Sequence, residues 1–206
     1  LQYSITAIGS VILQKAVNQL GSTVVAAIAA GGRISMFLCC PYDAMGSTMA
    51  TYTGQNLGAR ELKRVDKGMF SCSGIALVYS AFAIVVTCLL GPYMAMLFVS
   101  GSETGLIDLI QTYLVWTGAF YFPLALVNIV RFTIQGLGFG KLAILAGVCE
   151  MIARTIVGFY FVPAFGYTAA CLASPVAWIL ADLFLIPAYF WCIRYLKHRV
   201  FAREQG

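Results

Sequence analysis

Charged residues are scarce in this sequence of 206 residues, where they make up 10% of the chain, against about 25% in ordinary globular domains. Hydrophobic residues make up 61%. A soluble fold of this size would therefore lack the polar side chains that it needs to cover its surface. The shortage excludes an ordinary soluble domain and indicates a protein whose surface lies largely in lipid.

Histidine is also scarce, and the cysteines lack the spacing of a metal or redox site. His198 is the single histidine and lies in a basic tail, which excludes a histidine-based nucleophile relay and a multi-histidine metal site. The seven cysteines include no CxxC pair, so metal and redox spacings are absent and the thiols fit small packing residues. The segment GLGFG at 136–140 is shorter than a GxGxxG fingerprint and follows no strand. We expect no enzymatic activity and no cofactor or metal, apart from a coupling Na⁺.

Long apolar runs are abundant, and about 20 such residues cross a ~30 Å hydrocarbon core as a helix. Breaks at glycine and proline divide the runs. We therefore expect an all-α polytopic membrane protein, with a kink at Pro123 in the fourth helix. The six transmembrane helices are predicted at about 2–20, 22–56, 66–90, 104–137, 139–162 and 167–196.

The net charge of +5 is distributed as in a membrane protein, without the basic, aromatic-interleaved face of a nucleic-acid binder. Positive residues gather in the loop 57–67, at Lys141 and in the tail after Ile193. These three connections fall on one side of a six-helix topology. The positive-inside rule then predicts a multi-pass protein of the cell (inner) membrane with both ends of this segment cytoplasmic. Gly54 and Gly58, at the exit of the second helix, are expected to let a neighbouring helix approach closely.

Polar side chains recur every four residues along the first two helices. Such a row forms a slanting ridge on one side of a helix. Two neighbouring ridges predict the wall of a wet cavity, although hydrogen bonding inside a tight bundle gives the same pattern. The ridges consist of Gln2, Thr6, Ser10, Gln14 and Asn18, and of Ser35, Cys39, Asp43, Ser47, Thr51 and Gln55.

Several charged residues fall inside the predicted helices, where each costs about 2.5–3.5 kcal/mol at the bilayer centre on insertion scales. Glu150 and Arg154 are four residues apart and can pair on one helix face; such a pair is purely structural, or its carboxylate exchanges its partner for a proton or Na⁺. Asp182 has no nearby cation in sequence, so it is protonated, coordinates an ion or meets an arginine of another helix. Asp43 is similar, and Arg33 is a further charge at depth.

Three polar residues lie in the second half of the predicted fourth helix, namely Asn128, Arg131 and Gln135. Their spacing suits either the lining of a pathway or the capping of the helix end near Gly136. Both interpretations stay open from sequence.

The segment MATYTGQNLGARELKR, at 49–64, resembles the multidrug and toxic compound extrusion (MATE) family, in which helices two and eight end in a similar G-Q-x-x-G-A passage. Further similar pieces are QYSITAIGS, QKAVNQLGS, IQGLGFGK, EMIAR and ASPVAW. The resemblance implies that residues 1–206 are the carboxy-terminal lobe of a twelve-helix transporter, corresponding to its helices seven to twelve, with the amino-terminal lobe absent.

The resemblance also implies a function, namely antiport by alternating access that exports drugs and other amphipathic organic compounds against Na⁺ or H⁺. The polar faces with Gln14, Asn18, Asp43 and Ser47 would border the cavity between the lobes. A carboxylate that one branch of the family carries in its tenth helix falls at Leu124 here.

The candidate residues fall into two groups. The ion-coupling candidates are Glu150, Asp182, Asp43 and Arg154, and the substrate-cavity candidates are Gln14, Asn18, Ser47, Asn128 and Gln135. The expected partners are amphipathic small molecules, the lipid bilayer and the amino-terminal lobe. Two alternatives stay open: a lipid-linked oligosaccharide flippase, which needs a more cationic cavity, and a membrane interaction protein without transport activity.

Overall fold

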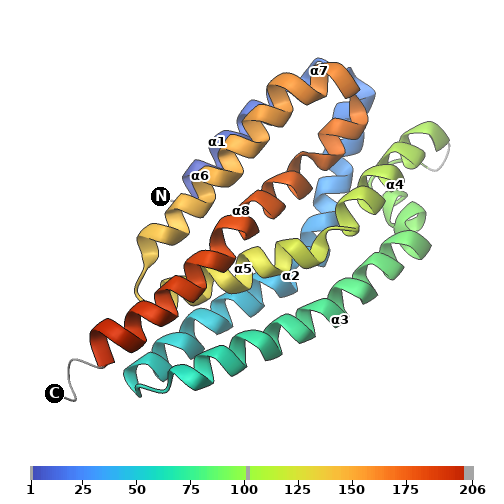
Figure 1. Ribbon diagram of the computed structural model, residues 1–206. Helices are drawn as coiled ribbons and strands as arrows, with labels where there is room; N and C mark the ends of the chain where they lie inside the picture. The colour runs from blue at the N-terminus through green and yellow to red at the C-terminus, as the bar shows by residue number, and fades with distance from the viewer. Residues whose placement is uncertain (1, 101–102, 202–206) are drawn as a thin grey trace.

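The computed structural model describes the backbone of residues 2–100 and 103–201, and these residues form helices and short turns without a strand (Figure 1). The all-helical membrane fold expected from the sequence is confirmed. The elements in chain order are α1 (Gln2–Asn18), α2 (Ser22–Gly58), α3 (Leu62–Ala95), α4 (Thr104–Gly118), α5 (Tyr121–Gly136), α6 (Gly140–Ile156), the π-helix η1 (Val157–Phe161), α7 (Val162–Phe165), α8 (Tyr167–Tyr195) and the π-helix η2 (Leu196–Phe201).

Four stretches of the described chain are long and apolar enough to cross a membrane: Ser22–Gly58, Leu62–Ala95, Gly140–Phe165 and Tyr167–His198. The bent pair α4 and α5 provides a fifth when it is counted as one span. With 17 residues, α1 is about 26 Å long at 1.5 Å per residue. The molecule is a multi-pass membrane protein.

The helix expected at 104–137 is broken in two. The axis bends by 49° between α4 and α5, at Ala119 and Phe120. Pro123 has no N–H to bond the carbonyl of Ala119, and the N–H of Phe120 bonds the nearer carbonyl of Thr117 at 3.1 Å. The kink expected at Pro123 is therefore found as a break just before it.

The helix expected at 139–162 also changes character near its end. After Ile156 the chain continues through η1 and the four-residue α7, and it turns at Gly166 with φ 60°. A residue with a side chain rarely adopts this φ. Pro163 lies at the start of α7 and has no N–H for the preceding turn, which fits a local change of helix type at this position.

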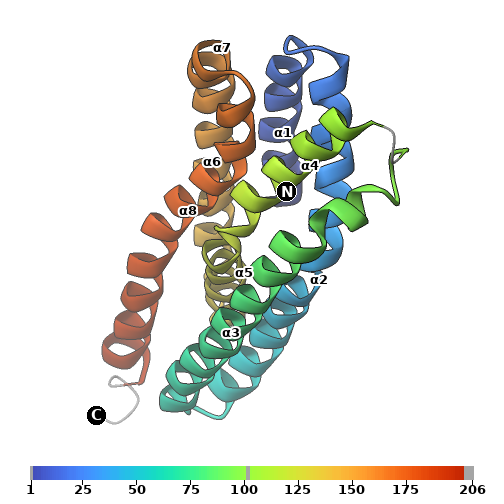
Figure 2. The same ribbon diagram turned by 90° about the vertical axis from the view of Figure 1, so that its right-hand side faces the viewer.

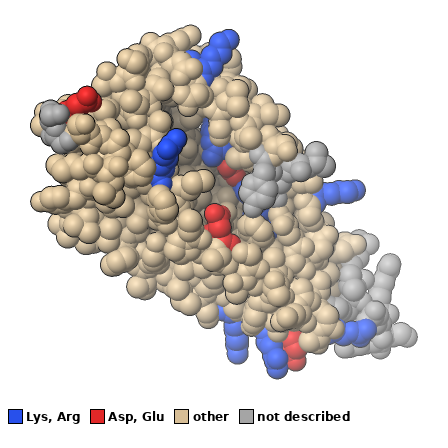
Figure 3. All heavy atoms as spheres, turned by 180° about the vertical axis from the view of Figure 1, so that it is seen from behind, with Lys and Arg blue, Asp and Glu red and all other residues tan. Residues whose placement is uncertain are grey.

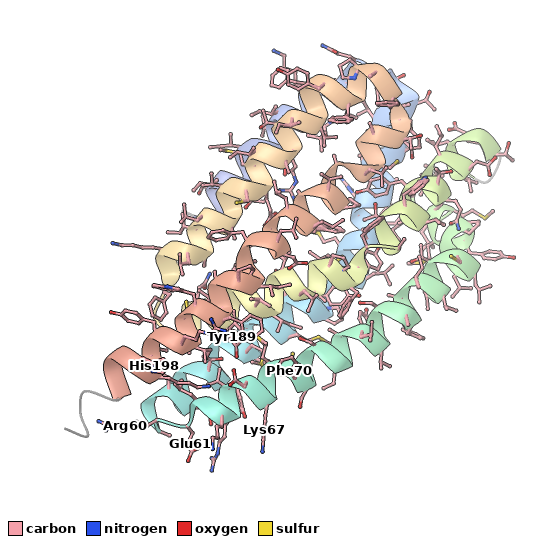
Figure 4. The ribbon with its side chains drawn as sticks, in the orientation of Figure 1. Arg60, Glu61, Lys67, Phe70, Tyr189 and His198 are labelled. Atoms are coloured by element: carbon pink, nitrogen blue, oxygen red, sulfur yellow. The ribbon has the colours of Figure 1, made fainter. Side chains whose placement is uncertain are left out.

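The helices pack as a bundle in which α5 is central. It lies between α8 on one side and α2 with α3 on the other, while α6 lies between α1 and α8 (Figures 1 and 2). The turns at 59–61 and 137–139 and the end of α8 lie toward one end of the bundle. The labelled Arg60, Glu61, Lys67 and His198 are all found at this end (Figure 4). The basic connections noted in the sequence thus lie toward the same end of the molecule.

The closest approach between α2 and α5 occurs at glycines other than the predicted pair. A Cβ on Gly136 would lie 2.6 Å from the carbonyl oxygen of Ala50, and one on Gly46 would lie 2.7 Å from the ring of Phe132. By contrast, a Cβ on Gly58 would meet nothing within 4 Å, and one on Gly54 would lie 3.9 Å from its nearest neighbour. Gly54 thus faces the backbone of Gly136 on α5, but less closely than Gly46 and Gly136 approach their neighbours. The prediction for Gly58 was wrong, because sequence spacing does not show which face of a helix meets its partner.

Candidate functional site

A cluster of buried charges lies where α5, α6 and α8 meet. Glu150 on α6 is 3% exposed, and both of its carboxylate oxygens accept hydrogen bonds from guanidinium groups. Arg131 of α5 donates through Nη2 to Oε1, and Arg154 of α6 donates through Nη1 to Oε2 at 3.1 Å. The predicted pairing of Glu150 with Arg154 is thus present in the structure, and Arg131 joins it from a second helix.

Asp182 on α8 belongs to the same cluster but lacks such partners. It is 8% exposed and within electrostatic range of Arg131 and Glu150. Its Oδ1 has no hydrogen-bond partner among the described residues, and the same is true of Nε of Arg131. The described part of the chain also contains no ion pair of Asp182 within 4.0 Å. We name Arg131, Glu150, Arg154 and Asp182 the charge cluster.

A second polar region follows the exposed face of α2. Asp43, Ser47, Thr51 and Gln55 are all exposed, and part of this face lines an open groove of about 530 Å³. The hydroxyl of Ser47 donates to the carbonyl of Asp43 at 2.6 Å, and that of Thr51 donates to the carbonyl of Ser47 at 3.3 Å. Ser47 and Thr51 also line the groove. We name these four residues the α2 polar row.

The predicted ridge on α2 does not face the groove along its whole length. Ser35 is buried and accepts a hydrogen bond from the hydroxyl of Tyr121 at 3.2 Å, so this part of the ridge joins helices together. On α1, the exposed Gln14 and Asn18 hydrogen-bond to each other at 2.9 Å. Ser35 therefore supports the bundle-contact interpretation, and the cavity wall stays a prediction for the exposed part of the ridges.

Asp43 is held in place by the next polar candidate. The half-buried Asn128 of α5 donates through Nδ2 to Oδ1 of Asp43 at 3.1 Å, which joins one predicted ion-coupling residue to one predicted cavity residue. Gln135 is also half-buried on α5, whereas Arg33 is exposed on α2. Leu124, at the position of the family's carboxylate, packs against the hydrophobic core.

The face opposite to that of Figure 1 is hollowed in its middle, and side chains of both charge signs lie in the hollow (Figure 3). Among the described residues, no group of three or more histidine, cysteine, aspartate or glutamate side chains is arranged to hold a metal ion.

Sequence reasoning placed Arg131 among residues that line a pathway or cap a helix, and the structure instead buries it, 5% exposed, in the charge cluster. One signal in the sequence could have found this contact. A lone arginine in an apolar helix needs a carboxylate partner, and Glu150 is the carboxylate nearest to it on the next predicted helix.

Comparison with known proteins places the chain in context. The MatE family profile matches residues 1–160. The "Probable multidrug resistance protein YpnP" of Bacillus subtilis (strain 168) is 28% identical over 130 residues, which are 63% of this chain and 28% of that protein.

Solved structures show the same fold. A MOP superfamily transporter from Pyrococcus furiosus, described as having a binding pocket of reverse polarity, matches with a TM-score of 0.80 at 17% identity, over 96% of this chain and 42% of its own. A multidrug resistance MATE family transporter of the MOP superfamily matches in its outward-facing conformation with a TM-score of 0.78 at 18% identity, again over 96% and 42%. Its inward-facing conformation matches with a TM-score of 0.75 over 90% of this chain. The chain thus spans well under half the length of these relatives.

Proposed function

The chain belongs to the MatE family, and on this premise we propose that it is the carboxy-terminal lobe of a secondary antiporter. The antiporter exports drugs or other amphipathic organic compounds in exchange for Na⁺ or H⁺, and it alternates between outward and inward access. It is not an enzyme, and it needs no cofactor other than the coupling ion. The observation that carries the proposal is the charge cluster, because ionisable residues buried inside a membrane bundle are costly and typically mark ion pathways or proton relays.

The substrate side of the proposal rests on the α2 polar row and its surroundings. The groove there combines exposed hydroxyl and amide groups with the apolar side chains of a membrane helix, as an amphipathic ligand requires. Gln14 and Asn18 on α1, and Asn128 and Gln135 on α5, are the further residues proposed for the cavity in the full-length protein. Asp43 is exposed and already oriented by Asn128, so it is better placed to meet a cationic substrate than to hold a deeply bound coupling ion.

The coupling side of the proposal rests on Glu150, Asp182 and Arg154, with Arg131 as an added member. Ion binding to a buried carboxylate changes the charge balance between α5, α6 and α8. Helices that pack around such a group have two discrete arrangements when its charge changes. This is the kind of element that links ion binding to access.

The partner of this lobe is proposed to be an amino-terminal lobe in the same full-length protein, with the cavity between them. The chain covers 42% of the solved relatives' chains, which leaves room for a second lobe, and rocking of one repeat against another is a known route to alternating access. The basic connections support a cytoplasmic position for both ends of the segment and a location in the cell membrane.

The flippase alternative loses support from the position of the arginines. A cavity for a pyrophosphate group needs cations that face it. Arg131 and Arg154 are instead buried and donate to Glu150, which leaves Arg33 as the exposed arginine of the three candidates.

The proposal is tested in proteoliposomes that contain the full-length protein. We expect a proton or sodium gradient to drive accumulation of an amphipathic cationic dye against its own gradient, and an ionophore that dissipates the ion gradient to stop it. Liposomes without protein and liposomes with a variant that replaces Asp43 by Asn serve as controls for leak and for substrate binding. Absence of gradient-driven flux for a panel of cationic, neutral and anionic amphiphiles would contradict the proposal.

A further inference from the structure

Within the charge cluster, we infer that Asp182 is the proton-binding residue of this lobe and that Arg131 is a counter-ion that exchanges between Glu150 and Asp182. The inference deepens the proposed cation coupling and rests on it. It selects H⁺ over Na⁺ and one carboxylate over the other candidates.

Both carboxylate oxygens of Glu150 already have hydrogen-bond donors. Its two oxygens each accept a guanidinium hydrogen bond, one from Arg131 and one from Arg154. Charge-assisted bonds of this type strongly favour the ionised carboxylate. A proton on Glu150 would have to displace an arginine and leave it buried without a partner, so Glu150 holds the arginines and does not carry the proton.

Asp182 has the opposite surroundings. It is almost as deeply buried as Glu150, yet its Oδ1 has no donor among the described residues. A buried carboxylate oxygen without a donor is costly when ionised, and a proton bonded to it removes that charge. The arrangement in the structure, with Arg131 on Glu150 and Asp182 alone, is the one expected for protonated Asp182.

The groups that face Asp182 come from two helices that pack against α8. They are Arg131 from α5 and Glu150 from α6. Arg154 of α6 donates to Glu150 and lies within electrostatic range of Tyr113 on α4. The remaining described charged or histidine side chains on α8 and on the elements packed against it are exposed, namely Lys15 on α1, Asp108 on α4, Lys141 on α6, Arg194 on α8, and Lys197 and His198 on η2. Asp66 on α3 is half-buried and accepts a hydrogen bond from Tyr189 of α8. The two arginines and Glu150 together carry one net positive charge, so ionised Asp182 makes the cluster neutral.

Loss of the proton from Asp182 therefore creates an attraction between its carboxylate and the guanidinium group of Arg131. Nε of Arg131 and Oδ1 of Asp182 are the two atoms of the cluster without hydrogen-bond partners in the described chain. When Asp182 is ionised, Arg131 can move toward it while Arg154 stays with Glu150. The exchange transfers a contact from the α5–α6 interface to the α5–α8 interface, and it gives the lobe two discrete states.

A proton suits this position better than Na⁺. A hard cation needs a shell of several oxygen ligands, whereas both oxygens of Glu150, the carboxylate nearest in the cluster, already accept hydrogen bonds from guanidinium groups. The guanidinium groups of Arg131 and Arg154 also repel a metal cation that binds in the cluster. Protonation forms one O–H bond at Asp182 with a proton taken from water on one side of the membrane, and its release to water on the other side breaks that bond without any transfer of electrons.

The test begins with infrared difference spectra of the full-length protein in detergent, recorded as the pH is changed. We expect a carbonyl band of a protonated carboxylic acid that is absent from Asp182→Asn, shifted in Asp182→Glu and unchanged in Asp43→Asn. Size-exclusion profiles show which variants are folded. If Asp182→Asn does not fold, the conservative Asp182→Glu still tests the inference through the shift of its band. A wild-type protein without such a band, or an Asp182→Asn protein that keeps it, would overturn the inference.

The second part of the test is transport in proteoliposomes. We expect Asp182→Asn to lower flux driven by a pH gradient by about tenfold or more, with partial recovery in Asp182→Glu and with the dissociation constant for substrate changed by less than about twofold. Flux driven by a sodium gradient at equal pH would overturn the assignment of H⁺. A band that disappears in Asp182→Asn, together with no gradient-driven flux in the wild type, would support the proton site and contradict the proposed transport function.

Discussion

Glu150 and Asp43 are both carboxylates on membrane helices, but they differ in burial and in the hydrogen bonds that they accept. Glu150 is 3% exposed and receives a guanidinium hydrogen bond on each oxygen. Asp43 is exposed and receives one hydrogen bond, from the amide of Asn128 at 3.1 Å. The first carboxylate is fully engaged within the lobe, and the second has acceptor capacity left for a ligand.

This difference separates two tasks. A fully paired buried group fixes helix packing, and removing one member leaves its partners uncompensated. An exposed group with free acceptor sites contributes little to packing and much to recognition. Asp66 lies between these extremes: it accepts a hydrogen bond from Tyr189 at 2.5 Å and pairs with Lys197 at 3.6 Å, with 31% of its side chain exposed. The three carboxylates therefore predict a ranking of mutational effects.

The largest effect is expected at the buried extreme of the comparison. Glu150→Gln removes the carboxylate that both Arg131 and Arg154 contact. Asp182 can then neutralise only one of the two arginines, so the free energy of unfolding should fall by about 3–5 kcal/mol. The measurement is thermal unfolding of the full-length protein in detergent, together with the yield of monodisperse protein.

A double variant provides the matched control. Glu150→Gln combined with Arg154→Gln removes one uncompensated cation along with the carboxylate, so the two changes should be clearly less harmful together than their sum. A Glu150→Gln protein as stable as the wild type would remove the distinction between the two carboxylates.

The next effect is expected at Tyr189, which is buried and donates to Asp66 across α8 and α3. Tyr189→Phe removes the donor and keeps the ring, and it should cost about 1–3 kcal/mol because the lost hydrogen bond goes to a charged acceptor. The same unfolding measurement applies. Tyr195→Phe, in which the ring packs on Phe139 and Trp191, is the matched control and should change stability by less than about 0.5 kcal/mol.

A smaller effect is expected at Lys197, the second partner of Asp66. The two side chains are 45% and 31% exposed, so Lys197→Gln should cost at most about 1 kcal/mol. The loss should shrink further at high salt, because exposed ion pairs are screened. Unfolding curves of wild type and variant at low and high salt check this, and an effect larger than that of Tyr189→Phe would contradict the ranking.

The smallest effect on stability is expected at Asp43, the exposed extreme. Asp43→Asn should change the free energy of unfolding by less than about 0.5 kcal/mol. It should weaken binding of a cationic substrate by about tenfold, which corresponds to about 1.4 kcal/mol, and leave a neutral analogue nearly unaffected. Binding titrations of the matched cationic and neutral compounds distinguish these outcomes, and equal losses for both would contradict a charge-based role.

Relations within one helix were predictable from the sequence, because a fixed rise and turn per residue place side chains without knowledge of the neighbours. The pairing of Glu150 with Arg154 four residues later is the clearest case, and the end-to-end segregation of basic residues is another. The apolar lengths likewise predicted most of the helical spans.

Relations between helices were not predictable in the same way. The contact of Arg131 with Glu150 and that of Asn128 with Asp43 depend on how α5 is rotated about its own axis after the break before Pro123. The closest approach of α2 and α5 at Gly46 and Gly136, and not at the predicted Gly54 and Gly58, depends on the same rotation. The periodicity of one sequence does not predict how a helix is rotated against its neighbours.

The division of tasks between the two regions is tested most directly by one transport measurement. In proteoliposomes, flux through the full-length protein is recorded against substrate concentration and against the pH gradient for wild type, Asp43→Asn and Asp182→Asn. The account predicts that Asp43→Asn raises the substrate concentration for half-maximal flux and keeps the dependence on the gradient, whereas Asp182→Asn loses that dependence and keeps substrate binding. Two variants that change the same parameter in the same way would contradict it.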